Sequence, residues 1–229
     1  NTNLKPNYPC LLRHGIEINN KQSFISCISD ALFFGITTHN KKKEKIQVKI
    51  LNNSEMKQQI IKSLTIDEYI KYQNGNLTSI FYDKLYNINH QSFNAKYPSV
   101  FFSKLNMNIK EEKFLYEKTC SSFINFISYL NDDTQIIDHS YLWDIVSKPN
   151  KHIFENGINL IIFNIPDNDI SNNVELICPT NHYSSELFNS KRQSLIIVKY
   201  GEYYEPIYSY STGKKLRVNK FFSEYDKHT

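Results

Sequence analysis

The sequence is poor in arginine, alanine and glycine, and it contains no long apolar run. Only 3 Arg, 2 Ala and 6 Gly occur among 229 residues, and the formal net charge is a modest +4. No apolar stretch approaches the roughly 18 residues that span a bilayer, so we expect no membrane partner. Few arginines and a small charge are untypical of a nucleic-acid surface, so nucleic acid is not an expected partner either.

The four cysteines are widely separated, at Cys10, Cys27, Cys120 and Cys178. None forms a C-x-x-C pair, so the spacing predicts no zinc knuckle. His139 follows an acidic residue, but no second pair at ligand spacing accompanies it. We therefore expect no metal and no cofactor, and we expect reduced thiols in an intracellular protein.

Hydrophobic residues make up 40% of the chain and aromatic residues 14%, which excludes a chain that is disordered throughout. The length suits one domain, which we place at residues 1–212, followed by a polar tail or linker at 213–229. The charge run Lys41–Lys45 is expected to be a solvated loop, because lysine is abundant along the whole chain.

Helical periodicity is clearest in the first two thirds of the sequence. One apolar stripe predicts a helix over 23–34, with Ser23 as its N-cap, and it consists of Phe24, Cys27, Ile28, Ala31 and Leu32. Further helices are predicted within 55–73, over 110–131 and over 141–146.

After Gly157 the pattern changes to short β-branched runs at 158–163, 174–178, 194–200 and 203–210. The short turn at Gly201 and Glu202 predicts an antiparallel hairpin between the last two strands. Helices followed by strands indicate an α+β fold.

This order of elements is that of papain-like cysteine proteases, and two short motifs strengthen the likeness. Residues 19–30, NNKQSFISCISD, resemble the motif of the OTU (ovarian-tumour) deubiquitinases, in which an Asp-Gly-x-Cys turn leads into a helix. Residues 203–208, YYEPIY, resemble the closing motif of that family. The resemblance implies an OTU-like fold, with N-terminal and central helices packed on a C-terminal, mostly antiparallel sheet.

The departures from the family pattern concern the catalytic positions. Ser23 stands where the family has its nucleophilic Cys, Asn20 where it has Asp, and Tyr203 where it has the His base. Only Glu205 matches the orienting position. A serine without a base is a poor nucleophile, and a tyrosine cannot serve as a base at neutral pH. The resemblance therefore implies an OTU-like domain without OTU chemistry, a pseudoenzyme in which no catalytic residue is favoured.

Residues 141–163 and 174–208 also resemble parts of large proteins of the nucleocytoplasmic large DNA (giant) viruses. This resemblance implies a domain of a large viral protein, located in the host cytoplasm, the viral factory or the virion. Its expected role is protein binding or scaffolding, with ubiquitin or another viral subunit as partner. The sequence does not set the oligomeric state.

Two other functions remain open at this stage. In an active cysteine protease or deubiquitinase, Cys27 would be the nucleophile and His182 the base, and either Asn20 or Gln22 would be an oxyanion donor. Cys27 also fits the apolar stripe as a core residue. The chain could alternatively be an unrelated structural or transcription-associated viral domain. For a binding role, Tyr203, Tyr204 and Tyr208 are the candidate docking residues, since tyrosine is enriched in interfaces.

Overall fold

The structure is a computed structural model, and it describes residues 9–16, 19, 21–33, 37–39, 45–47, 49–84, 86–166, 173–178, 188–212 and 216–224. Asn20 and His182 lie outside the described residues. Residues 41–44 of the expected Lys41–Lys45 loop lie outside them as well. The expectations for these residues remain predictions.

The fold is α+β, and its helical part follows the first strand. The helical elements are α1 (Ser23–Phe33), α2 (Asn53–Ser63), α3 (Ile66–Tyr69), the 3-10 turn η1 (Tyr72–Gly75), α4 (Leu77–Ile80), α5 (His90–Lys96), α6 (Val100–Ser103), α7 (Lys110–Asn131) and α8 (His139–Ser147). Within the described part of the chain, none of these helices is both long and apolar enough to cross a bilayer.

Within the described residues, the main sheet is mixed and has six strands. They are β1 (Cys10–Arg13), β4 (Asn159–Ile165), β5 (Glu175–Ile177), β6 (Ser194–Tyr200), β7 (Tyr203–Thr212) and β8 (Leu216–Asn219). The order is β1-β7-β6-β4-β5, and β8 also pairs with β7. Strands β4 and β6 run parallel, whereas the other neighbours run antiparallel. The parallel pair arises because the chain turns back through β5 before it returns along the other side of β4.

A separate ribbon pairs β2 (Thr37–His39) with β3 (Lys45–Gln47), and the sequence pattern did not predict it. The predicted helices agree better with the structure. The helix expected over 23–34 is α1, and the one expected over 110–131 is α7. The expected stretch 55–73 is interrupted, because the Thr65 side chain accepts a hydrogen bond from the backbone N–H of Glu68 and starts the new helix α3.

Helix α1 lies between the sheet and α2, and every residue from Ser23 to Ala31 is buried. On the sheet side, the Phe24 ring packs at 5.4 Å from the Tyr204 ring of β7. On the other side, the Ser26 hydroxyl donates to Asn53 Oδ1 at 2.7 Å. A helix buried on two sides needs such polar partners, because a buried hydroxyl without one is costly.

Part of the expected C-terminal tail is ordered as strand β8, which pairs with the far half of β7. Beyond β8, the backbones of Phe222 and Ser194 form two hydrogen bonds of 2.9 and 2.7 Å. This corrects the expected tail for residues 216–222. The segment is polar overall, but Val218 lies partly buried against the core and Phe222 is buried.

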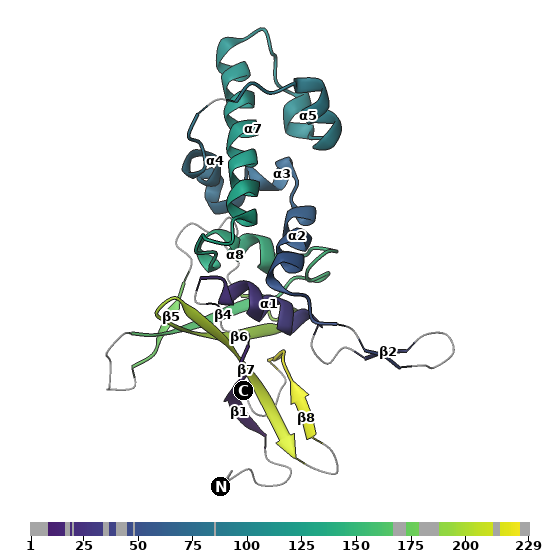
Figure 1. Ribbon diagram of the computed structural model, residues 1–229, viewed down its shortest axis with the longest axis vertical. Helices are drawn as coiled ribbons and strands as arrows, with labels where there is room; N and C mark the ends of the chain where they lie inside the picture. Colours follow the sequence, from purple (N-terminus) through teal and green to yellow (C-terminus); the bar gives the residue numbers. More distant parts are fainter. Residues whose placement is uncertain are drawn as a thin grey trace.

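The two faces of the sheet differ, as Figure 1 shows: the labelled helices gather on one side of it. Side chains such as Leu160, Ile162, Leu195 and Ile197 point to the helices and are almost fully buried. The alternate residues form the opposite surface, here called the outer face. Its centre consists of Ile161, Phe163, Ile165, Ile196, Val198 and Ile207, which the strand register places side by side.

Gly157 joins α8 to β4 in a conformation that favours glycine, with φ of +69°. A Cβ at this position would lie 2.6 Å from the Ser147 carbonyl oxygen. We expect Gly157→Ala to lower the free energy of unfolding by about 2 kcal/mol, because both the backbone angle and the close approach oppose it.

Chemical denaturation of Gly157→Ala would measure this loss. Gly15→Ala is the matched control, since nothing lies within 4 Å of a Cβ at Gly15. Equal stability of the two variants would contradict the expectation.

Candidate functional site

The start of α1 meets the start of β7, although the two segments are far apart in the sequence. Ser23 Oγ accepts a hydrogen bond of 2.9 Å from the backbone N–H of Tyr204 and donates to the Glu202 carbonyl at 3.5 Å. Ser23 is 1% exposed. Its hydroxyl therefore fastens α1 to β7, and this corrects the expectation that it caps the helix.

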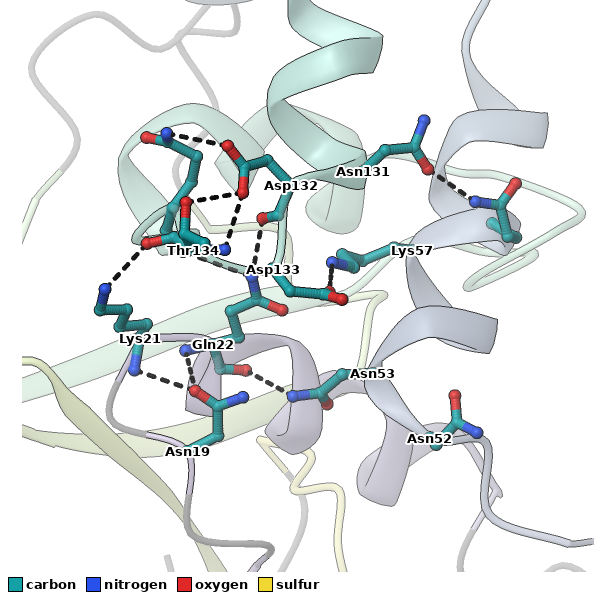
Figure 2. Close-up of polar contacts among 12 residues, drawn as sticks. Asn19, Lys21, Gln22, Asn52, Asn53, Lys57, Asn131, Asp132, Asp133 and Thr134 are labelled. Carbon is teal, nitrogen blue, oxygen red and sulfur yellow. Dashed lines mark hydrogen bonds and ion pairs between the residues drawn. The ribbon is translucent and has the colours of Figure 1, made fainter.

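Residues before α1 provide the turn that leads into it, as Figure 2 shows. Asn19 Oδ1 accepts hydrogen bonds from the backbone N–H groups of Lys21 and Gln22, each at 3.1 Å. The Gln22 amide donates to the carbonyls of Asp132 and Gln135, at 3.1 and 3.3 Å. Gln22 thus holds the loop after α7, and its amide protons are directed at that loop.

Cys27 lies one turn further along α1 and is fully buried. Burial raises the pKa of its thiol well above the ordinary value, and the negative charges of Asp30 and Glu205 raise it further. Because the thiolate is the reactive form, such a thiol is unreactive. Cys27 is therefore a residue of the hydrophobic core, as its place on the apolar stripe suggested. His182, its expected partner, lies outside the described residues.

Tyr203 and Glu205 lie on the outer face of the sheet, whereas α1 lies on the other face. Strand alternation places them there, because Tyr204 between them is buried against the helices. Glu205 forms an ion pair with Arg13 of β1 at 3.3 Å. Burial raises the pKa of Tyr203. The backbone groups on both sides of position 203 bond to the Ser23 hydroxyl. The Tyr203 side chain nevertheless points away from that hydroxyl.

Tyr204 and Tyr208 point into the core, at 1% and 0% exposure. The Tyr204 hydroxyl shares a hydrogen bond of 2.7 Å with His139 Nδ1. Burial lowers the pKa of His139, against the opposing effect of Asp138. This corrects the expectation that Tyr203, Tyr204 and Tyr208 are docking residues. Tyr203 lies on an accessible surface, whereas Tyr204 and Tyr208 do not.

A buried polar cluster joins α1 to β7 and to the strands beside it. The Tyr208 hydroxyl donates to Asp30 Oδ2, and Lys220 Nζ donates to the Asp30 carbonyl at 2.7 Å. His14 Nε2 lies 3.6 Å from Asp30 Oδ1, and His14 Nδ1 shares a hydrogen bond of 2.6 Å with Tyr210. Burial lowers the pKa of Lys220 to about 8, although Asp30 opposes this shift.

A cavity of about 310 Å³ adjoins this cluster and is lined by His14, Ser26, Asp30, Asn53 and apolar side chains including Leu51. The sequence pattern does not predict this cluster, because Asp30 lies off the apolar stripe of α1 and is buried only because the helix is covered on two sides. A carboxylate in such a place needs a donor. Among the described residues, no group of three potential ligands could hold a metal ion.

The burial of Cys27 predicts its chemical behaviour. In the native protein at neutral pH, we expect Cys27 to resist alkylation by iodoacetamide, because the raised pKa and the burial both oppose attack. Mass-spectrometric mapping would measure this, with the exposed Cys178 as an internal control that reacts. Labelling of Cys27 as fast as Cys178 would show that the thiol is accessible and reactive.

The polar cluster predicts a stability effect. Tyr208→Phe removes a donor from the buried Asp30 carboxylate, so we expect a loss of about 1–3 kcal/mol in the free energy of unfolding. Tyr200→Phe is the matched control, because Tyr200 is 54% exposed, and we expect it to change stability by less than about 0.5 kcal/mol. Equal effects in urea denaturation would argue against a structural role for the Asp30 contact.

The chain was compared with protein-family models, with curated proteins and with solved structures, and none of the three comparisons found a match. The site is therefore interpreted from its own geometry. That geometry consists of a buried serine at the start of α1, a sealed thiol one turn later and a polar cluster around Asp30.

Proposed function

We propose that the chain is a non-catalytic, OTU-like domain of a large viral protein and acts as a protein-binding or scaffolding module. The observation that carries this proposal is the hydrogen bond between Ser23 Oγ and the Tyr204 backbone. It places the two segments that resemble OTU motifs side by side, although they are separated by about 180 residues of sequence. A papain-like arrangement requires this meeting of the first helix with a late strand.

Three features of the site support the absence of catalysis. The Ser23 hydroxyl is occupied by backbone groups and is shielded from solvent. The Tyr203 side chain lies on the opposite face of the sheet, and its raised pKa keeps the phenol protonated at neutral pH, so it is not available to accept a proton from Ser23. Glu205 forms an ion pair with Arg13 of β1.

A binding role is supported by the surface beside these residues. Tyr203 belongs to the outer face, whose centre is made of aliphatic and aromatic side chains. Exposed apolar patches on a folded domain mark interaction sites. In this proposal the partner is a protein, either ubiquitin or another subunit of the virus, and the domain works inside the infected cell or the virion.

An active cysteine protease based on Cys27 is not favoured. Its nucleophile would have to leave a fully buried position, and its Gln22 amide would have to release the carbonyls of Asp132 and Gln135. Both changes would break the packing around α1.

A ubiquitin-propargyl probe separates the two functions. We expect no covalent adduct by mass spectrometry after prolonged incubation, because no accessible thiolate lies at the start of α1. Cys27→Ala is the control for any adduct that does form. An adduct that appears with the natural chain and disappears with Cys27→Ala would overturn the proposal.

The partner can be narrowed separately. Titration of the isotope-labelled chain with ubiquitin, followed by NMR up to about 1 mM, detects even weak binding. Shifts at Tyr203 and its neighbours would support ubiquitin as the partner. No shifts would remove ubiquitin and leave another viral subunit.

A further inference from the structure

The outer face is an apolar surface that no described helix covers. Its six central residues lie outside the hydrophobic core cluster between the sheet and the helices; Val198 is buried and the other five are half-buried. Around this centre, Leu176 is 58% exposed, Tyr200 54% and Leu11 50%. These side chains come from β5, β6 and β1, so the apolar surface extends across five strands of the sheet.

The size of this surface is sufficient for a dimer. With strands about 4.8 Å apart and a rise of about 3.3 Å per residue, five strands over about six residues give roughly 450–500 Å² of flat area. Two such faces in contact bury roughly 1,000 Å² before the relief of the side chains is added. That value reaches the lower end for a specific interface.

The charges on the outer face favour a neutral, apolar occupant. On strands β1, β7, β6, β4 and β5, this face carries one basic and one acidic side chain, Arg13 and Glu205, and they pair with each other. Strand β8 adds one more basic side chain at the edge of the face, Arg217, which lies opposite Ser211. Two copies of the face would not repel one another. A nucleic acid or an anionic lipid surface would find no cluster of basic groups there.

We propose that the outer face is covered by the outer face of a second copy of this chain, in a two-fold symmetric dimer. Sheets pack face to face about 10 Å apart with their strands nearly aligned, and the same patch can serve both subunits. This inference concerns the same surface as the proposed function but names a second copy of the chain as its occupant, and it requires neither the OTU likeness nor ubiquitin.

Sedimentation equilibrium of the full chain from about 1 to about 200 µM tests the proposal, because this range detects dimers with micromolar dissociation constants. We expect the average mass to rise with concentration from 27.0 kDa toward twice that value. Phe163→Lys should weaken the association at least about tenfold, because two-fold symmetry places two unpaired ammonium groups in the interface.

The control is Val100→Lys on α6, where the natural side chain is 63% exposed and the helix packs against α3. It should leave the association unchanged. Leu176→Lys provides a second test on the outer face, because its exposed position tolerates lysine if Phe163→Lys fails to fold by circular dichroism.

Three results would overturn the proposal. One is a mass that stays at 27.0 kDa over the whole range. Another is an equal weakening by Val100→Lys and by the outer-face variants. The third is a monomer whose outer face binds ubiquitin in the NMR titration, which would assign the surface to a different protein. The probe test of catalysis is independent of all three.

Discussion

The complete burial of helix α1 is the constraint on which the rest of the structure depends. Its buried residues include Ser23, Ser26, Ser29 and Asp30, and each of these polar groups needs a partner. The partners come from β7, from α2 and from the segment before α2. Because an unsatisfied buried polar group costs about 1–3 kcal/mol, these contacts tie the sheet and the helical layer to fixed positions around α1.

The same constraint explains the chemistry at the start of α1. A hydroxyl accepts a backbone hydrogen bond well, whereas a thiol accepts it weakly. Serine at position 23 therefore suits the attachment of α1 to β7. One turn later the environment is apolar, and Cys27 suits it as a small hydrophobic residue.

Local periodicity predicted the helices α1 and α7 and most strands of the sheet, because each has a clear apolar pattern of its own. Local pattern could not identify the partner of Asp30, since Tyr208 is 178 residues away. It also could not decide which tyrosine of the pair Tyr203 and Tyr204 faces the helices. Both are aromatic, so the phase of the strand depends on its register with β6, and a shift of one residue exchanges the two faces.

Strand β8 and the outer face show the same limit. The polar residues around Val218 do not predict a strand, and pairing with β7 provides the hydrogen bonds that the short pattern alone would not secure. In the sequences of β4 and β6, the outer-face residues Ile161, Phe163 and Ile196 are as apolar as the neighbours that face the helices. The sequence pattern therefore does not distinguish the two faces of these strands. Which side the helices cover is decided only when the layers assemble.

The pairing of β1 and α1 with β7 has a consequence for the order of folding. Cys10 pairs with Tyr210, and Ser23 bonds to Tyr204, so the first two elements of the chain are completed by one of the last. During synthesis on the ribosome, the apolar stripe of α1 has no sheet to cover it until residues 203–212 have emerged. Contacts between such distant residues slow folding and leave apolar surface exposed in the meantime. Between the synthesis of α1 and that of β7, the growing chain therefore carries an uncovered apolar surface that favours aggregation.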